Sequence, residues 1–321
     1  MDEEKRKTEK ISVVVPCYNE ESCIPIFYEK TNEVLASLPL EAEYIFVDDG
    51  SSDRSLSLMR ELHEKDPRVK YVSLSRNFGK EAAMYAGLKR ACGDYVALMD
   101  VDLQDPPQLL AEMYEGITAE GNDCVASRRV TRKHEPVVRS MFARMFYRVI
   151  NRMTDTEIMS GARDFRLMTR QMVDAVLSLA EVDRFSKEMF SWVGFKTKWL
   201  EYENVERAEG VSKWNFKKLT HYAINGIESA TIVPLKINFT FFLLFLIASV
   251  GFAVTDIAFH FSDRQVSDLF ILLPILFFSV SLLFLGLYVT SRYVGKVFKL
   301  VRGRPIYIVK ETEESDLKNC R

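Results

Sequence analysis

The sequence has 321 residues, a formal net charge of −2 and 48% hydrophobic residues. This balance gives no reason to expect nucleic-acid binding, and the apolar content is ample for one large domain or two smaller ones. The five cysteines are scattered, odd in number and without a CxxC pair, which argues against a disulfide framework or zinc site and favours reduced thiols in a cytosolic compartment. The charged N-terminus lacks an apolar run, so we expect no cleavable secretion signal.

Strands alternate with helices through the N-terminal part of the chain. Runs of β-branched, aromatic and other apolar residues predict strands at 11–15, 44–47, 69–73, 95–99 and 123–127. The intervening segments predict a helix that ends near 36 and further helices at 53–65, 80–92 and 107–120. This alternation is typical of βαβ units and predicts an α/β fold with a mainly parallel sheet.

Polar clusters follow four of these strands, at Pro16–Glu20, Asp48–Asp53, Ser75–Lys80 and Asp100–Gln104. In parallel α/β sheets, ligands bind beyond the carboxyl ends of the strands. We therefore expect the clusters to gather several carboxylates and Lys80 at one edge of the sheet. A plain turn is the alternative for Asp48–Ser51, because Asp-Gly is a strong turn signal.

Asp100 and Asp102 follow a buried strand and are one residue apart. At a strand end, where the backbone turns, both carboxylates can reach one hard cation and the phosphates that it carries. The pair therefore points to metal-assisted chemistry on a nucleotide diphosphate, although an isolated Asp-x-Asp is more often a solvated turn.

Basic residues concentrate between 128 and 152, where Glu135 is the only acid. From Arg139 onward, Met, Phe, Val and Ile residues recur at helical spacing, which predicts a basic amphipathic helix suited to an anionic membrane surface. The alternative is a solvated helix face whose apolar stripe packs on the core. Arg128 and Arg129, next to a strand end, are better candidates for the site.

Two apolar segments, 237–259 and 269–290, are each long enough to cross a hydrocarbon core of about 30 Å as a helix. Two buried core helices of a soluble protein are the alternative. Basic residues precede the first segment and follow the second, and the positive-inside rule then makes both flanks cytoplasmic. We therefore expect a multi-pass protein of the inner cell membrane, with both termini and the preceding domain in the cytoplasm.

Four ordered motifs lie at the predicted strand ends: VPCYNEE (15–21), VDDGS (47–51), SRNFGK (75–80) and DVDLQDPP (100–107). Later segments include DFRL (164–167), VGF (193–195) and RAEGVSK (207–213). Together they resemble the inverting family 2 glycosyltransferases of GT-A fold. More closely, they resemble the polyprenyl-phosphate group that contains bactoprenol glucosyltransferase and dolichol-phosphate mannose synthase. The resemblance covers nearly the whole chain.

The resemblance implies roles for individual residues. The substrate-binding set would comprise Pro16, Tyr18, Glu20, Val47, Asp48, Asp49, Lys80, Val101, Arg128, Arg129, Arg207 and Lys213. Mg²⁺ or Mn²⁺ and the diphosphate would be held by Asp100, Asp102 and Gln104, and the catalytic set would be Asp100, Asp102 and Asp164. The role of Asp164 stays open: it could orient the acceptor, contact the metal-bound donor, or pair with Arg163 or Arg166.

The resemblance also implies an activity. It favours an inverting, metal-dependent transfer of glucose from UDP-glucose to undecaprenyl phosphate, and the absence of a Gln-x-x-Arg-Trp motif favours a single transfer over polymerisation. Alternatives are another donor (GDP-mannose, UDP-N-acetylhexosamine or a UDP-aminoarabinose type), a non-catalytic membrane scaffold, or a nucleotide-sugar hydrolase. A homo-oligomer also stays open.

The expected domain order follows from these segments. It comprises a tail at 1–10, a GT-A domain at 11–212, a juxtamembrane amphipathic segment at 213–236, a transmembrane hairpin at 237–290 and a cytosolic tail at 291–321.

Overall fold

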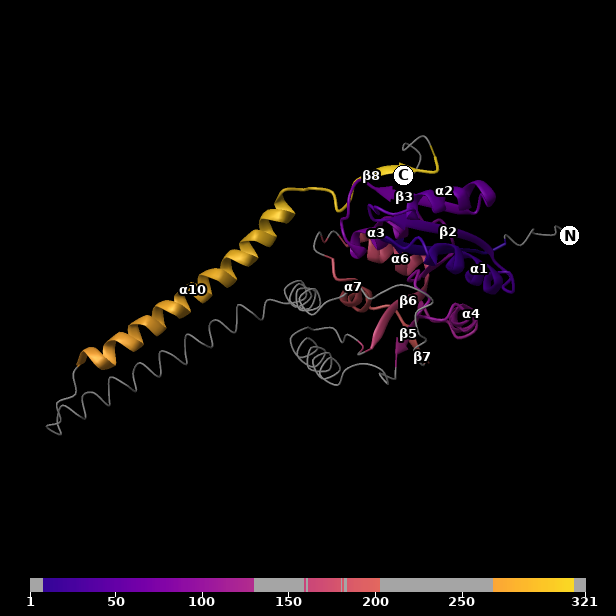
Figure 1. The fold of residues 1–321 in the computed structure, drawn as a ribbon. Helices are drawn as coiled ribbons and strands as arrows, with labels where there is room; N and C mark the ends of the chain where they lie inside the picture. The colour runs from indigo at the N-terminus through magenta and orange to yellow at the C-terminus, as the bar shows by residue number, and fades with distance from the viewer. Residues whose placement is uncertain are drawn as a thin grey trace. The chain divides into compact units, whose positions relative to one another are not determined.

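The computed structural model describes residues 8–129, 159, 161–179, 181, 184–202 and 268–314 (Figure 1). The chain divides into two compact units, Met1–Gly226 with Pro305–Arg321, and Ile227–Arg304. The first unit contains all the predicted strand-end motifs. The C-terminal residues therefore belong to the same unit as the N-terminal strands.

A single eight-stranded sheet forms the centre of the described part of the first unit, in the order β7-β5-β6-β4-β1-β2-β3-β8. Its strands are β1 (Lys10–Cys17), β2 (Glu41–Asp48), β3 (Val69–Leu74), β4 (Tyr95–Leu98), β5 (Cys124–Arg129), β6 (Ala162–Thr169), β7 (Thr197–Tyr202) and β8 (Val309–Thr312). The pairings β1–β2, β1–β4, β2–β3 and β5–β7 are parallel. The α/β fold and the mainly parallel sheet are thus confirmed.

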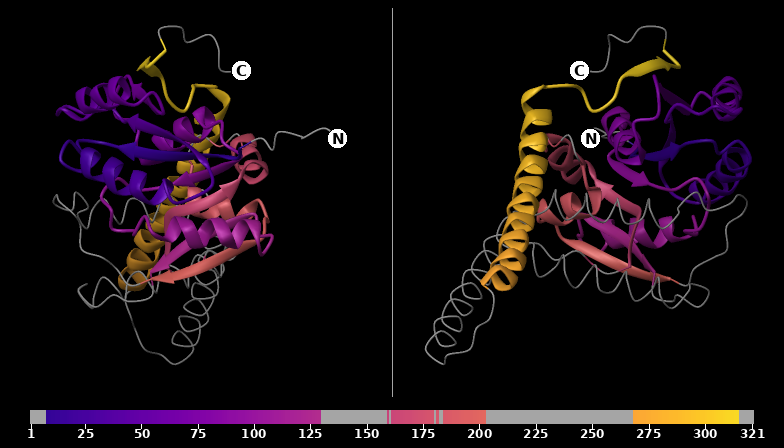
Figure 2. Two further views of the ribbon diagram at one scale, coloured as in Figure 1. Left: turned by 90° about the vertical axis from the view of Figure 1, so that its right-hand side faces the viewer. Right: turned by 60° about the vertical axis from the view of Figure 1, so that its left-hand side comes forward.

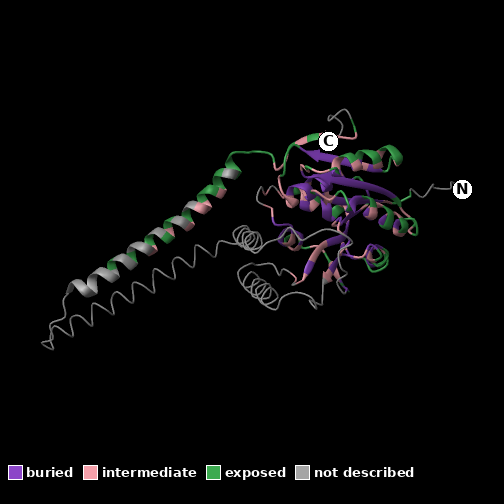
Figure 3. Ribbon diagram, in the orientation of Figure 1, coloured by how far each residue is buried: buried purple, intermediate pink, exposed green. Residues whose placement is uncertain are grey.

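Helices cover both faces of the sheet. Alternate strand residues point to opposite sides, and both sides are apolar here, so each side has to be buried. Val13, Val15 and Phe46 join one core cluster, whereas Val14 and Ile45 join the other. The first cluster includes residues of α1 (Cys23–Leu35), α2 (Ser55–Lys65) and α4 (Leu109–Thr118). The second includes residues of α3 (Lys80–Arg90), α6 (Arg170–Ser178) and α7 (Ser186–Trp192). Figure 3 shows the buried strands between helices with exposed outer faces.

Two strands run against the others. β6 pairs antiparallel with both β4 and β5, so its N-terminal end lies at the carboxyl ends of those strands. β8 pairs antiparallel with β3 at the sheet edge, and Figure 2 shows this yellow strand beside the N-terminal part of the sheet. Sequence analysis assigned no strand to either segment. The reversal of β6 matters for the candidate site, because it carries Asp164 to the edge where β4 and β5 end.

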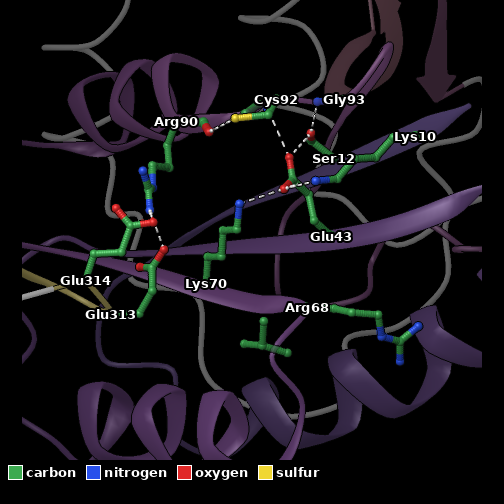
Figure 4. Close-up of polar contacts among 12 residues, drawn as sticks. Lys10, Ser12, Glu43, Arg68, Lys70, Arg90, Cys92, Gly93, Glu313 and Glu314 are labelled. Carbon is green, nitrogen blue, oxygen red and sulfur yellow. Dashed lines mark hydrogen bonds and ion pairs between the residues drawn. The ribbon is translucent and has the colours of Figure 1, made fainter. Parts of the chain in front are cut away.

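The opposite edge of the sheet, at the amino ends of the strands, holds a buried carboxylate, Glu43 (Figure 4). Lys10 Nζ lies 2.7 Å and Lys70 Nζ 2.9 Å from Glu43 Oε2. Glu43 Oε1 accepts hydrogen bonds from Ser12 Oγ at 2.5 Å and from the Cys92 amide at 2.9 Å. We call these five residues the Glu43 cluster. Burial acts to raise the pKa of Glu43, but its four donors outweigh burial and lower the pKa to about 2.

The described part of the second unit consists mainly of one helix, α10 (Asp268–Val301). The predicted span 269–290 falls within this helix, and the predicted span 237–259 lies outside the described residues. A helix needs about 20 consecutive apolar residues to cross a bilayer. No helix of the described residues meets the length and apolarity that crossing requires. This finding contradicts the expectation that the chain is a multi-pass protein of the inner membrane.

Candidate functional site

The loops after β1 and β2 are tied together at the carboxyl ends of the strands. The Asn19 amide donates to Ser51 Oγ at 2.9 Å, and the Ser52 amide donates to Asn19 Oδ1 at 2.8 Å. Asn19 has a φ of 54°, in the left-handed region that Asn tolerates better than most residues. Two of the predicted clusters are therefore in contact, and their backbone is fixed by side-chain hydrogen bonds.

Asp48 and Asp49 are neighbours with different partners. Asp48 Oδ1 accepts a hydrogen bond from the Ser51 amide at 2.9 Å, three residues further along the chain, as Asp side chains often do in turns. Asp48 Oδ2 accepts a hydrogen bond from Ser73 Oγ at 2.9 Å. The plain-turn alternative therefore describes Asp48. Asp49 instead reaches the third cluster, because its two oxygens accept from the Phe78 amide at 2.7 Å and the Gly79 amide at 2.9 Å. Burial raises the pKa of Asp49 despite these bonds.

This crossing of loops depends on a glycine. Gly50 has a φ of 69°, and a Cβ at this position would lie 2.5 Å from the Arg76 carbonyl carbon. Only glycine combines this backbone conformation with so close an approach. Gly50 thus lets the segment that leads to Lys80 pass directly over the second loop.

Lys80, Asp100 and Asp164 meet at the centre of this edge, and we call them the Lys80 cluster. Lys80 Nζ lies 2.6 Å from Asp100 Oδ1 and is also hydrogen-bonded to Asp164 Oδ2. The side chains are 38%, 25% and 15% exposed, respectively. Lys80 is the first residue of α3, Asp100 lies in the loop just after β4, and Asp164 lies near the start of β6. Sequence analysis named all three, and the fold brings them into direct contact.

Charge within the cluster determines its protonation. Burial acts to raise the pKa of Asp164, but Lys80 and Lys187 outweigh it and hold that pKa well below the usual range. Burial acts to lower the pKa of Lys80, but Asp100 and Asp164 hold it well above its ordinary value. Asp164 is therefore an anion, and Lys80 a cation, throughout the physiological pH range.

Asp102 and Gln104 lie beside the cluster and have other contacts. Asp102 Oδ1 accepts from the Gln104 amide at 3.3 Å, and Gln104 Oε1 accepts from Arg163 at 3.2 Å. Between them, Leu103 has a φ of 52°, which is unusual for a branched side chain and costs energy. Strain of this kind concentrates at functional sites, where the surrounding structure maintains it.

The family resemblance implies a bound metal ion, and the side chains at this edge show whether one would fit. Within the described residues, no group of three or more His, Cys, Asp or Glu side chains is arranged to hold one. Mg²⁺, however, often uses one or two carboxylates together with substrate phosphates. Asp100 and Asp102 supply hard oxygen donors, and Asp164 Oδ1 is buried without a hydrogen-bond partner. The residues therefore fit a cation shared with a diphosphate rather than a closed protein cage.

The remaining predicted donor contacts differ in exposure. The Tyr18 side chain is 40% exposed, and the Glu20 amide donates a hydrogen bond to Ser55 Oγ at 2.8 Å. Pro16 is partly buried. The side chains of Val47 and Val101 are 0% and 4% exposed, respectively, so they belong to the core. A role for either valine in binding would have to use its backbone.

The predicted phosphate-binding residues are described only in part. Arg128 lies at the carboxyl end of β5 and is 3.6 Å from Glu201 of the neighbouring β7. Arg129 ends β5 and pairs with Tyr202 through the backbone. Arg207 and Lys213 lie outside the described residues, as does the basic segment from 130 to 152.

Three charged residues beside the site were not among the predicted site residues, although Arg163 was named as a possible partner of Asp164. Arg163 contacts Gln104 and also donates to Asp105 Oδ1 at 3.1 Å. Lys187 donates a hydrogen bond to the Ala162 carbonyl at 3.0 Å, and its positive charge lowers the pKa of Asp164. Glu81 accepts from the Ser186 amide and hydroxyl at 3.2 and 3.1 Å. Adjacency to Lys80 and Asp164 could have indicated Glu81 and Arg163, but no local signal indicated Lys187.

Comparisons with known proteins identify a family and several relatives. Residues 12–177 match the family model described as glycosyl transferase family 2. The chain is 36% identical over 320 residues to the putative glycosyltransferase CsbB of Bacillus subtilis (strain 168), with 97% of each chain covered. It is 37% identical over 313 residues to the bactoprenol glucosyl transferase of Shigella phage SfII, covering 96% of this chain and 99% of that relative. A crystal structure of mannosyl-3-phosphoglycerate synthase from Rubrobacter xylanophilus aligns with a TM-score of 0.49 and 14% identity, over 68% of this chain and 72% of that one.

Proposed function

The chain belongs to glycosyltransferase family 2, and on that premise we propose that it transfers one glucose from UDP-glucose to undecaprenyl phosphate with inversion. The observation that carries the proposal is the meeting of Asp100, Asp164 and Lys80 at the carboxyl ends of the strands. The choice of sugar and lipid is supported by relatives named bactoprenol glucosyl transferase, which align over nearly their full length.

On the donor side, the reaction separates a nucleotide diphosphate from the sugar, so negative charge develops on the leaving group. A divalent cation bound by Asp100 and Asp102 would stabilise that charge as a Lewis acid. Lys80 adds a positive charge within reach of the same position. Asp49 contributes indirectly, because its bonds to the Phe78 and Gly79 amides hold the segment that presents Lys80.

On the acceptor side, the low pKa of Asp164 favours a phosphate acceptor over a hydroxyl acceptor. A sugar hydroxyl needs a general base, and a carboxylate whose pKa is held well below its usual range is a poor one at neutral pH. A phosphate monoester has a second pKa of about 6 and is already an anion near pH 7. Such an acceptor needs cations and positioning, which Arg128 and Arg163 can supply from this edge.

The test is transfer of labelled sugar by the purified full-length protein to undecaprenyl phosphate in detergent, with a panel of nucleotide sugars and Mn²⁺ or Mg²⁺. We expect a labelled lipid from UDP-glucose. Asp102→Asn should reduce its formation by about 100-fold or more, the loss typical when transition-state charge stabilisation is removed. The matched control is Asp174→Asn, which changes an aspartate that is 66% exposed on α6 and should leave the rate unchanged.

Each other outcome separates an alternative. A labelled lipid from a different donor would keep the reaction class and change the sugar. Release of free sugar without a lipid product would indicate a hydrolase. No product from any donor would indicate a scaffold without activity, and full activity of Asp102→Asn would rule out the role of this carboxylate in metal binding.

A further inference from the structure

The Lys80 cluster contains two carboxylates and one ammonium group. Lys80 Nζ is 2.6 Å from Asp100 Oδ1 and bonded to Asp164 Oδ2, so the nitrogen lies between the two acids. An ammonium group has three donors, and two of them are used here. The arrangement places a monovalent cation where the two carboxylates converge.

The local charge explains why a cation is needed there. Two carboxylates that converge on one point repel each other, and the cost rises when they are partly withdrawn from water. Asp164 is only 15% exposed and Asp100 25% exposed. The single charge of Lys80 offsets one of the two acids. Lys187 also acts on the charge of Asp164, but Asp164 Oδ1 is buried without a hydrogen-bond partner, so the cluster keeps an oxygen atom whose hydrogen-bonding capacity is not used.

The Lys80 side chain is longer and more flexible than the carboxylate side chains that it contacts. Its side chain is 38% exposed and is carried by the first residue of α3, whereas Asp164 is fixed within β6 beside Arg166 and Lys187. A lysine side chain has four carbons between its backbone and its charge, so the ammonium can shift by several rotamer changes without a change of fold.

We propose that Lys80 is a displaceable counter-cation that occupies the acidic pair in the absence of donor and limits binding of free divalent metal. The ammonium and a divalent cation repel each other and compete for Asp100, so metal alone has to displace Lys80 without a new partner for it. A metal that arrives with a diphosphate supplies that partner, because the phosphate oxygens accept the released ammonium. Lys80 thereby acts as a positioning residue that couples metal binding to donor binding. This inference rests on the proposed function.

The wild-type protein provides the first measurement. Mn²⁺ binding is followed by electron paramagnetic resonance, which counts free Mn²⁺, in the absence and presence of UDP. We expect Mn²⁺ alone to bind at least about tenfold more weakly than Mn²⁺ with UDP. Equal affinities would overturn the inference without any need for a variant.

The second measurement removes the ammonium group. Lys80→Met keeps the length of the side chain and should tighten the binding of Mn²⁺ alone by about tenfold, because a competing positive charge is gone. Lys80→Arg keeps the charge and should not tighten it. Lys89→Met is the matched control, since Lys89 is an exposed lysine on the same helix and its loss should leave Mn²⁺ binding unchanged.

The outcomes distinguish this inference from the proposed function. If wild-type protein binds Mn²⁺ with UDP but Lys80→Met gains no affinity for Mn²⁺ alone, Lys80 is a permanent link between α3 and β6 and only the inference fails. If wild-type protein binds neither UDP nor Mn²⁺ with UDP, the proposed function fails and the inference with it. A fold check by circular dichroism accompanies each variant. If Lys80→Met does not fold, the neutral Lys80→Gln takes its place, with the same expected gain in affinity for Mn²⁺ alone.

Discussion

Two clusters of partly buried charge lie at opposite edges of the same sheet, and they differ in the ratio of acids to bases. The Glu43 cluster places one carboxylate between two lysines and gives each of its oxygens two partners (Figure 4). The Lys80 cluster places one lysine between two carboxylates and leaves Asp164 Oδ1 without a hydrogen bond. One set of polar groups is satisfied by the protein, and the other is not.

This difference separates a structural site from a binding site. A buried carboxylate whose hydrogen-bonding capacity is filled has nothing to offer a ligand, and its removal leaves its partners unpaired. A cluster with an excess of carboxylate can gain stability from a further cation. We therefore assign stability to the Glu43 cluster and ligand binding to the Lys80 cluster, and the following predictions test that assignment.

The largest expected effect on stability is at Glu43. Glu43→Ala leaves Lys10 and Lys70 without their shared anion and should lower the free energy of unfolding by about 3 kcal/mol, measured by urea denaturation at pH 7. The control Glu41→Ala changes an exposed glutamate on the same strand and should stay within about 0.5 kcal/mol of the wild type. UDP binding should survive Glu43→Ala, and a loss of UDP binding with little loss of stability would reverse the assignment.

A smaller effect is expected on acidification. The folded-state pKa of Glu43 is about 2 and its ordinary value is 4.5, so its contribution to stability is complete above pH 4.5 and is lost as the pH falls toward 2. The difference between wild type and Glu43→Ala should therefore shrink by about 2 kcal/mol between pH 7 and pH 3. A difference that is constant over this range would mean that packing, rather than charge, stabilises this end of the sheet.

The smallest effect is expected at Glu81, beside the Lys80 cluster. Burial, followed by repulsion from Asp164, raises the pKa of Glu81 to about 7, although Lys80, Arg166 and Arg184 also face it. Because the folded pKa lies above the ordinary 4.5, the folded state binds the proton more tightly, and stability falls as the pH rises from about 4.5 to about 7.

Glu81→Gln should remove this slope. We expect wild type to lose about 1 kcal/mol relative to the variant between pH 5 and pH 6, measured by urea denaturation. Glu64→Gln, at an exposed position on α2, is the control and should keep the wild-type slope. If Glu81→Gln also keeps it, the excess of negative charge around Asp164 does not extend to Glu81.

Local sequence patterns predicted the first five strands because those strands are continuous apolar runs between polar clusters. β1, for example, was predicted at 11–15 and extends over Lys10–Cys17. The patterns did not predict β6, β7 or β8. β6 interrupts its apolar residues with Arg163, Asp164 and Arg166, and β8 is a short edge strand with alternating charge, so neither segment has the local signature of a strand. Pairing with neighbouring strands decides both.

The same division holds for the site and its interpretation. By itself, the sequence indicated Asp100, Asp102 and Lys80, because motif spacing at strand ends is local information. Asp164 was a candidate only through the family resemblance. The membrane location that was expected from the two apolar segments was wrong. Only the tertiary structure decided that Lys80 lies between Asp100 and Asp164, since this requires β6 to run against β4 and bring residues 84 positions apart into contact. The energy of a charge depends on its neighbours in space, and those neighbours are fixed by the sheet.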